Sequence, residues 1–472
     1  GRYTGNALQM VDSGDYLVPA YSPDRVNFTK PPMTYWAISA SVKVFGRTTW
    51  AARIPNALAY LLTGLLVFAM GRVLVPEKPW LPALVYACAL APFMAANVVS
   101  TDTLLTLFEA LAMYGFIAAT FGTASSSPSR RASVNLMWLG FGLAFLTKGP
   151  PGLMPLLGVV PFMIRRDGWR GMRACLSWSG FALFLISGFL WYAVVMIRHP
   201  WLVHYYLHNE IYERIFTGVQ NRNPQWYGWL RAYGPVFLVG TLPWWGSLLR
   251  GVRRVASVER LRSWWNHPSA PLFLLLWFSV PLVVFCVAKS RLPVYVLPLF
   301  LPLSLMLAIM LRTRINLASL GQRVALVAWI VVMLGIKGGI SYFGHPLSDE
   351  RAHSNALNSL VDSSSYHAIV FVQDTDYGVA IEEHTPWGMR LYTGKTIYGV
   401  AWRKTGAKAK VCRLLQDHEG VLFALDENIR MQTFDQALAS CHGNRHMQSG
   451  HWWDRKLVLA HAIPVHSPDH AQ

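Results

Sequence analysis

Long apolar segments recur along the first three quarters of this chain, and they constrain its fold more than any other feature. Ten segments can be recognised, separated by short polar or basic stretches, and several are long enough to cross a bilayer as a helix. They cover approximately residues 54–75, 80–97, 103–121, 134–147, 151–164, 176–197, 227–249, 270–288, 292–311 and 323–343. We therefore predict a mainly α-helical polytopic membrane protein, with about ten transmembrane helices over residues 54–344.

The composition of the 472 residues agrees with a membrane protein, because 53% are hydrophobic and only 14% are charged. Soluble domains carry about a quarter charged residues. The net charge of +18 would also fit a nucleic-acid-binding protein, but the arginines lie in short loops between apolar segments. That distribution is typical of membrane topology, so we predict membrane lipids and no nucleic acid as partners.

Basic residues are concentrated in every second loop, and the positive-inside rule makes those loops cytoplasmic. The residues are Arg72, Lys78, Arg130, Arg131, Arg165, Arg166, Arg170, Arg173, Arg250, Arg253, Arg254, Arg260, Arg262, Arg312, Arg314 and Arg323. Residues 1–53, the alternate loops and everything after about residue 345 are then predicted to be extracytoplasmic.

Residues 345–472 read as a small soluble α/β domain. Residues 368–372, 421–425 and 456–460 have the apolar, β-branched composition of buried strands, and residues 357–361 and 434–440 look helical. Cys412 and Cys441 both lie in this domain, where a disulfide is permitted, but their spacing leaves the pairing open. We expect Cys88, Cys175 and Cys286 to be free.

Polar residues at the outer helix ends are the candidates for chemistry. Lys30 stands directly before Pro31-Pro32, Asp102 follows Ser100-Thr101 at the start of an apolar segment, and Lys148 precedes Gly-Pro-Pro at a predicted turn. Each residue also has a purely structural interpretation, since Asp is a good helix cap and interfacial lysines are common.

The loop of residues 198–226 is the richest in polar side chains. Glu210 and Arg214 are four residues apart and would share one face of a helix. His204 and His208 have the same spacing and would bind a metal ion only with a nearby carboxylate, so a divalent metal stays an open alternative.

Lys289, Arg291 and Tyr295 place two cations and a phenol at a further outer turn. Arg can clamp a phosphate through two hydrogen bonds, and a Tyr hydroxyl can donate a third. The alternative is a pair of flanking charges that end two membrane helices. Together with Lys30, Lys148 and Arg214, these residues predict a site for a phosphate-linked lipid, where negative charge develops on a leaving group.

These motifs resemble the dolichyl-phosphate-mannose protein mannosyltransferase superfamily, and within it the branch of undecaprenyl-phosphate aminoarabinose lipid A transferases. The matching motifs follow the order of the family: Arg2-Tyr3, Ser13-Gly14-Asp15, Lys30-Pro31-Pro32, Thr101-Asp102, Thr147-Lys148-Gly149-Pro150, Glu213-Arg214, Leu242-Pro243-Trp244 and Lys289-Ser290-Arg291-Leu292-Pro293-Val294-Tyr295. The resemblance implies a GT-C fold in a bacterial inner membrane, with interfacial helices in the first outer loop and the active site outside the cytoplasm.

The resemblance further implies an inverting glycosyltransferase that moves a sugar from a polyprenyl-phosphate donor to lipid A or another cell-envelope acceptor. Six residues are expected to serve directly: Asp102 as the catalytic carboxylate, Lys30, Arg214 and Tyr295 on the donor phosphate, and Tyr3 and Glu210 in the substrate cavity. Lys148, Lys289 and Arg291 are further candidates for phosphate binding.

Two alternatives remain at this point: a protein O-mannosyltransferase-like enzyme with another acceptor, and a lipid or solute transporter. Transporters place ionisable groups near the bilayer midplane and often contain internal repeats, neither of which is visible here. In the family, an acidic pair directly before the Arg-Tyr motif supplies the main carboxylate. We therefore expect the chain, which begins at Gly1, to be part of a longer protein.

Overall fold

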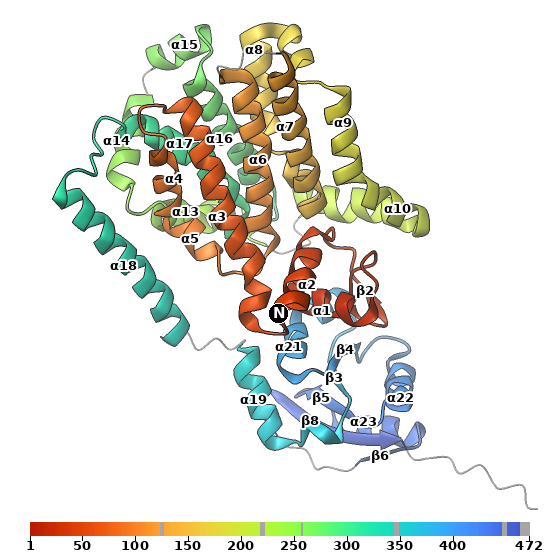
Figure 1. The fold of residues 1–472 in the computed structure, drawn as a ribbon. Helices are drawn as coiled ribbons and strands as arrows, with labels where there is room; N and C mark the ends of the chain where they lie inside the picture. Colours follow the sequence, from red (N-terminus) through yellow and green to blue (C-terminus); the bar gives the residue numbers. More distant parts are fainter. Residues whose placement is uncertain (123–126, 218–221, 256–257, 344–348, 446–450, 463–472) are drawn as a thin grey trace, which may run out of the picture. The chain divides into compact units, whose positions relative to one another are not determined.

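A computed structural model of the chain describes residues 1–122, 127–217, 222–255, 258–343, 349–445 and 451–462. It divides into two compact units, one helical and one α/β (Figure 1). The helical unit contains residues 29–41 and 50–344, and the α/β unit contains residues 1–28, 42–49 and 345–472.

Among the described residues of the helical unit, all the regular elements are helices. Its elements, together with the two helices α2 and α3 that pass between the units, are α2 (Met33–Phe45), α3 (Thr49–Leu74), α4 (Trp80–Ala87), α5 (Leu90–Ala95), α6 (Thr101–Phe121), α7 (Ser127–Lys148), η1 (Pro150–Leu153), α8 (Leu156–Ala174), α9 (Trp178–Phe184), η2 (Leu185–Phe189), α10 (Leu190–Arg198), α11 (Trp201–Tyr205), η3 (Tyr206–Tyr212), α12 (Glu213–Phe216), α13 (Gly228–Gly240), α14 (Trp245–Val255), α15 (Val258–Asn266), α16 (Ala270–Val287), η4 (Pro293–Leu299), α17 (Phe300–Leu311) and α18 (Leu320–Phe343).

Six of these helical stretches, within the described residues, are long and apolar enough to cross a membrane: 49–74, 101–121, 178–198, 270–287, 293–311 and 320–340. The other four predicted spans fall on shorter or more polar helices. Residues 80–97, for example, form the two short helices α4 and α5, because Ala89 takes an extended conformation between them. The protein is thus a multi-pass membrane protein, while the count of ten crossings stays a prediction.

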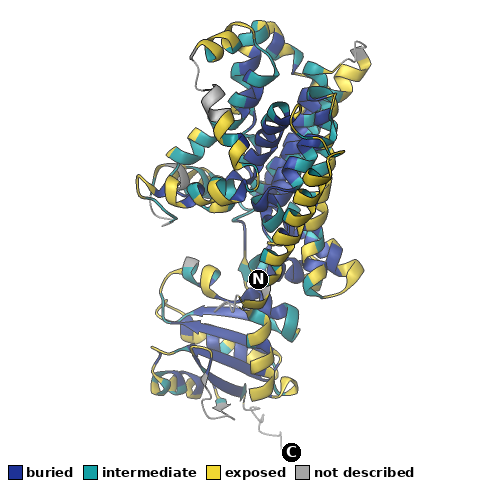
Figure 2. Cartoon of the chain, turned by 90° about the vertical axis from the view of Figure 1, so that its left-hand side faces the viewer, coloured by how far each residue is buried: buried dark blue, intermediate teal, exposed yellow. Residues whose placement is uncertain are grey.

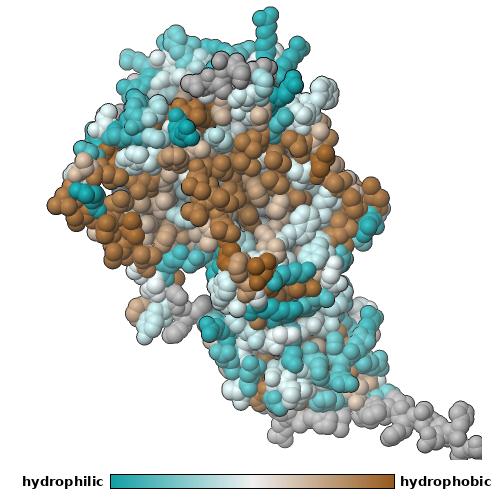
Figure 3. All heavy atoms as spheres, in the orientation of Figure 1, coloured by the Kyte–Doolittle hydropathy of each residue, from teal (hydrophilic) through white to brown (hydrophobic). Residues whose placement is uncertain are grey.

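The outer surface of the helical unit matches a membrane environment. Figure 3 shows hydrophobic residues gathered over its middle and hydrophilic residues at the end that carries α8 and α15. On α18, Val324, Val327 and Val331 expose 58%, 60% and 62% of their surface, as expected of side chains that face lipid. Inside, aromatic side chains such as Phe116 and Phe273 pack with ring centroids 4.9 Å apart.

The α/β unit contains one sheet of order β4-β3-β5-β8-β6, with β7 paired to β8. Its elements are α1 (Arg2–Ser13), β1 (Ala20–Ser22), β2 (Arg25–Val26), α19 (Glu350–Leu360), η5 (Ser363–Ser365), β3 (Ala368–Gln373), α20 (Gly378–His384), η6 (Trp387–Met389), α21 (Arg390–Thr393), β4 (Thr396–Ala401), α22 (Ala407–Asp417), β5 (Val421–Asp426), α23 (Met431–Ser440), β6 (Gly443–Arg445), β7 (His451–Trp452) and β8 (Arg455–Ala462). The strands predicted from the sequence correspond to β3, β5 and β8. β3 runs parallel to β4 and β5, whereas β8 runs antiparallel to β5.

Two hydrophobic cores cover the two faces of this sheet. Successive residues of β3 alternate between them, since Val370 and Val372 belong to one core and Ile369 and Phe371 to the other. Figure 2 shows the strands buried beneath helices whose outer sides are exposed. Because both faces of β3 are covered, its sequence is apolar throughout and does not alternate with polar residues.

The first 28 residues belong to the α/β unit, and the prediction that residues 1–53 form the first extracytoplasmic loop stays a prediction. Tyr21 stacks on Trp387 with ring centroids 4.8 Å apart, and Arg390 forms an ion pair with Asp12 at 2.5 Å. These contacts join residues more than 360 positions apart, and no local pattern in the sequence predicts them.

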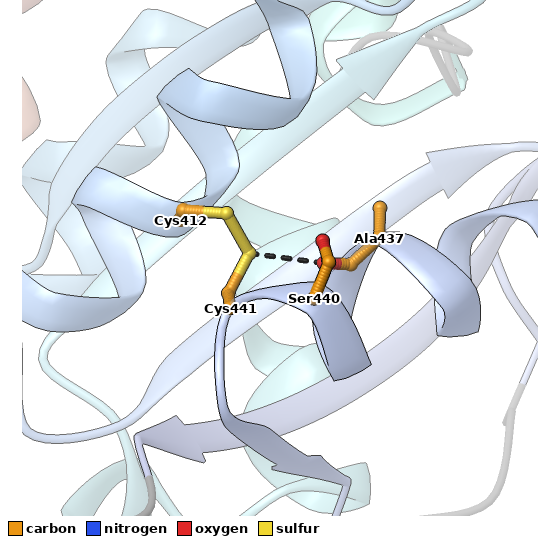
Figure 4. The surroundings of a disulfide bond; sticks show 4 residues. All are labelled: Cys412, Ala437, Ser440 and Cys441. Atoms are coloured by element: carbon orange, nitrogen blue, oxygen red, sulfur yellow. Dashed lines mark hydrogen bonds between the residues drawn. A yellow bond between two sulfur atoms is a disulfide. The ribbon is translucent and has the colours of Figure 1, made fainter. Parts of the chain in front are cut away.

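A disulfide joins Cys412 of α22 to Cys441 at the end of α23 (Figure 4), which settles the pairing that the spacing left open. Cys88, Cys175 and Cys286 are free, as predicted. The bridge ties together two helices that cover the same face of the sheet.

Candidate functional site

A cavity of about 400 Å³ lies within the helical unit. Its walls are mainly apolar, with Phe145, Met154, Phe189, Val284 and Phe285 among the lining side chains. The polar side chains among the lining residues are few and are Thr29, Lys30, Lys148, Tyr192, Tyr206, Glu210, Ser290 and Tyr295. Four of these eight, Lys30, Lys148, Glu210 and Tyr295, were predicted as site residues from the sequence.

Asp102 and Lys148 form a buried ion pair. Asp102 lies in the first turn of α6 and Lys148 is the last residue of α7, and their side chains are 5% and 7% exposed. Both positions suit the helix dipoles, since carboxylates are favoured at N-termini and cations at C-termini. Lys148 lines the cavity, so Asp102 reaches the site through its lysine partner.

The cap of α6 is Ser100, whose hydroxyl accepts a hydrogen bond from the backbone N–H of Asp102 at 3.3 Å. Asn56 of α3 binds the carbonyls of Val98 and Ser100, at 2.7 and 3.2 Å, and fixes the chain that enters the helix. The cap of this helix is therefore Ser100 and not Asp102, and the Asp102 carboxylate forms the ion pair with Lys148.

Tyr295 completes this part of the cavity. The Lys148 ammonium lies 4.2 Å from the centre of the Tyr295 ring, a cation–π contact. Arg222 donates a long hydrogen bond of 3.5 Å to the Tyr295 hydroxyl. Two cations thus surround the phenol, and sequence reasoning had missed Arg222.

Lys30 lies on the segment that precedes α2, where Pro31 and Pro32 lead into the helix. Prolines suit this position because the first helical N–H groups have no partner within the helix. The Lys30 ammonium donates to the carbonyl of Thr29 at 2.7 Å and lies 3.1 Å from a carboxylate oxygen of Glu210. Glu210 thus pairs with Lys30, a partner that its spacing from Arg214 did not predict.

Glu210 belongs to η3, a π-helical stretch that covers the cavity with Tyr206, Leu207 and Ile211. The second oxygen of its carboxylate accepts a hydrogen bond of 3.4 Å from the Tyr205 hydroxyl. π-helical turns are rare and often occur at functional sites.

Arg291 and Lys289 are placed differently from the other candidates. Arg291 is 4% exposed and donates to the carbonyls of Asn223 and Gln225 at 2.7 Å and of Cys286 at 2.9 Å. It holds two backbone segments together. Lys289 is exposed, and neither side chain is among those that line the cavity.

Two further predictions have a different outcome. The backbone of Arg214 lies in α12, but its side chain is outside the described part of the structure. Tyr3 belongs to α1 of the α/β unit. The roles of both residues stay predictions.

The histidines of the outer loop stack on each other, with the rings of His204 and His208 centred 5.2 Å apart. His208 also lies 3.7 Å from Glu213. Within the described residues there is no group of three or more His, Cys, Asp or Glu side chains that could hold a metal ion.

Sequence reasoning also missed two hydroxyls and a carboxyl. The hydroxyls of Tyr206 and Ser290 are buried and have no hydrogen-bond partner among the described residues, and both residues line the cavity. Burial, together with the nearby Glu210 carboxylate, raises the pKa of Tyr206, so its hydroxyl stays protonated. Glu109, seven residues after Asp102 on α6, is 2% exposed. A lone carboxyl inside an apolar segment is the signal that could have found it.

The geometry suits one class of ligand. An apolar cavity with lysines, a phenol and unpaired hydroxyls fits an amphiphile whose headgroup is anionic and whose tail is apolar. Lipid phosphates have this chemistry.

Comparisons with known proteins agree with the motifs. A family model described as dolichyl-phosphate-mannose-protein mannosyltransferase matches residues 29–192, which include Lys30, Asp102 and Lys148. The undecaprenyl phosphate-alpha-4-amino-4-deoxy-L-arabinose arabinosyl transferase of Aeromonas salmonicida is 32% identical over 349 residues, which are 71% of this chain and 59% of that protein. The enzyme of the same name from Edwardsiella ictaluri is 30% identical over 321 residues, covering 65% and 54%.

The chain thus spans somewhat more than half the length of these curated relatives. Among solved structures, it is similar to ArnT from Cupriavidus metallidurans bound to undecaprenyl phosphate, with a TM-score of 0.72, 18% identity and coverage of 97% of this chain and 92% of that one. The apo state of the same protein gives a TM-score of 0.71. The fold is therefore shared with ArnT, and the predicted resemblance to the mannosyltransferase superfamily and its aminoarabinose branch is confirmed.

Proposed function

We propose that this chain carries the catalytic membrane unit of a glycosyltransferase that moves a sugar from an undecaprenyl-phosphate donor to lipid A. One observation carries the proposal: Lys30, Lys148 and Tyr295, which are far apart in the sequence, line one apolar cavity. The names of the relatives and the lipid phosphate bound to ArnT support the same ligand class. The multi-pass protein would lie in a bacterial inner membrane, with about ten crossings and with the cavity and residues 345–472 outside the cytoplasm.

In the proposed reaction, an acceptor hydroxyl attacks the anomeric carbon of the donor sugar in a direct displacement. The bond from that carbon to the phosphate oxygen breaks, the lipid phosphate leaves with the bonding electrons, and the proton of the acceptor hydroxyl passes to the released phosphate or to water. Lys30, Tyr295 and Arg214 would stabilise the charge on the departing phosphate, because fixed cations and donors act most strongly where charge develops. Lys148, which also lines the cavity, would add a further cation.

Asp102 has a more specific role in this proposal than the sequence suggested. Because its carboxylate is buried against Lys148, it would act as a positioning residue that holds this cation towards the cavity. A positioning role predicts that Asp102→Asn lowers kcat, while Asp102→Glu retains part of it.

The proposal is tested with the intact protein in membrane vesicles, supplied with defined undecaprenyl-phosphate sugars and lipid A. We expect sugar transfer that Lys30→Ala reduces by about a hundredfold, the size typical for the loss of one electrostatic contact to a developing charge. Arg47→Ala removes a cation of the α/β unit and serves as the control. Transfer that is unchanged in Lys30→Ala would refute the site.

A second acceptor deserves the same assay, because the family model over residues 29–192 is described by protein mannosylation. A hydroxyl-bearing peptide would replace lipid A in that arm. Transfer to the peptide and none to lipid A would keep the donor site and change the acceptor.

A further inference from the structure

Both lysines of the cavity are already paired with carboxylates. Lys30 lies 3.1 Å from Glu210, and Lys148 is bound to Asp102. These four side chains carry two positive and two negative charges, so each lysine is partly neutralised before a phosphate arrives. A phosphate that binds at Lys30 competes with the Glu210 carboxylate for the donors of that ammonium.

The two carboxylates differ in how firmly they are held. Asp102 is buried in the first turn of a long helix whose entry is fixed by Ser100 and Asn56. Glu210 is more exposed, at 16% for its side chain, has one more rotatable bond, and lies in the π-helical stretch η3. Glu210 is consequently the carboxylate that moves at lower cost.

Other hydrogen-bonding partners for the Glu210 carboxylate lie close to it. One of its oxygens lies 3.4 Å from the Tyr205 hydroxyl. The buried Tyr206 hydroxyl, without a partner among the described residues, lines the same cavity. These phenols can keep the carboxylate hydrogen-bonded after it leaves Lys30, which avoids the cost of an unsatisfied buried charge.

We propose that Glu210 is a gate for the lipid phosphate. Its carboxylate pairs with Lys30 in the empty cavity, separates from Lys30 when the phosphate of the donor binds there, and competes with the phosphate for Lys30 again after transfer. The inference rests on the proposed function, because it assigns Glu210 a role at that donor site. It makes Glu210 a specificity-determining residue that acts on the headgroup.

The competition has a chemical purpose. The donor is a phosphodiester with a single negative charge, whereas the released lipid phosphate is a monoester that carries about −1.5 to −2 at neutral pH. Two lysines without a competing carboxylate would hold this more highly charged product tightly. A carboxylate that returns to Lys30 weakens that hold and favours release of the product.

The test measures the binding of undecaprenyl phosphate to the purified intact protein in detergent. Removing the competing charge in Glu210→Gln should tighten binding by about tenfold, corresponding to one charge-assisted hydrogen bond that no longer has to be broken. Glu213→Gln, three residues further along and absent from the cavity lining, is the matched control and should bind as the wild type does.

A second arm separates the gate from a merely structural role. In the Lys30→Ala background, Glu210→Gln should lose its effect, because the cation that Glu210 pairs with is gone. Should Glu210→Gln fail to fold, Glu210→Ser removes the same charge and gives the same reading.

Two outcomes would overturn the proposal in distinguishable ways. If Lys30→Ala weakens binding but Glu210→Gln binds no more tightly than the wild type, the gate is wrong and the donor site stands. If the wild-type protein does not bind undecaprenyl phosphate at all, the proposed function fails together with the gate.

Discussion

Asp102 and Lys148 show how one ion pair organises the residues of the site. The pair joins the start of α6 to the end of α7, and the lysine then contacts the Tyr295 ring. Removing one partner leaves an uncompensated charge in a buried setting, whereas removing both leaves none.

At this scale we predict strong coupling between the two residues. Asp102→Ala should destabilise the protein by about 3–5 kcal/mol, and the double change with Lys148→Met by less than the sum of the two single changes. Thermal unfolding in detergent measures both. The exposed pair of Arg312 and Glu77 is the control, and breaking it should cost less than about 1 kcal/mol. Additive losses at Asp102 and Lys148 would contradict the coupling.

Arg291 is predicted to act on stability and hardly on the donor. Its guanidinium binds three backbone carbonyls, and a lysine cannot reproduce this fork. Arg291→Lys should lower the melting temperature, while the KM for the donor stays close to that of the wild type. A raised KM with an unchanged melting temperature would instead return Arg291 to the phosphate site.

Among the elements, the turn between α7 and α8 depends most on a single residue. Gly149 has φ +73° and ψ −141°, a conformation that residues with a Cβ rarely adopt, and a Cβ here would lie 3.0 Å from the Tyr192 hydroxyl. The turn ends α7 immediately after Lys148, so its geometry sets where the lysine points.

Gly149→Ala should therefore cost about 1–3 kcal/mol of stability and reduce binding of the lipid phosphate through the displaced Lys148. Gly64→Ala, in the middle of α3 with open space around it, is the matched control and should be neutral or slightly stabilising. Unfolding and lipid-binding measurements on the two variants decide the matter. Equal behaviour of both would show that the turn tolerates a side chain.

The elements also show what the sequence could predict. β3, β5 and β8 were visible because a strand covered on both faces is apolar throughout, and the long spans were visible because lipid-facing helices are apolar on all sides. The partners of the site were not visible. The pairing of Lys30 with Glu210 joins residues 180 positions apart, and no periodicity reports contacts between distant helices.

At the scale of the whole molecule, the basic loops predict the orientation in the membrane. Alkaline phosphatase fused after residue 472 should be active, because the α/β unit would lie outside the cytoplasm, and a fusion after Ala174, at the basic end of α8, should be inactive. Activities in the opposite order would invert the topology and remove the cavity from the outer face.

The membership of residues 1–28 in the α/β unit is a feature of the whole molecule that the sequence did not predict. It arises from Tyr21 and Asp12, which find Trp387 and Arg390 across most of the chain length. Such long-range pairs depend on the complete fold, so composition and hydropathy could not have predicted them.

A structure of the intact protein determined with undecaprenyl phosphate tests the central claim most directly. We predict that the phosphate lies within about 3.2 Å of the Lys30 ammonium, a hydrogen-bond distance, that Tyr295 faces it, and that the tail follows the apolar wall formed by Phe145 and Phe189. A lipid phosphate bound elsewhere, with Lys30 still paired to Glu210, would contradict the account.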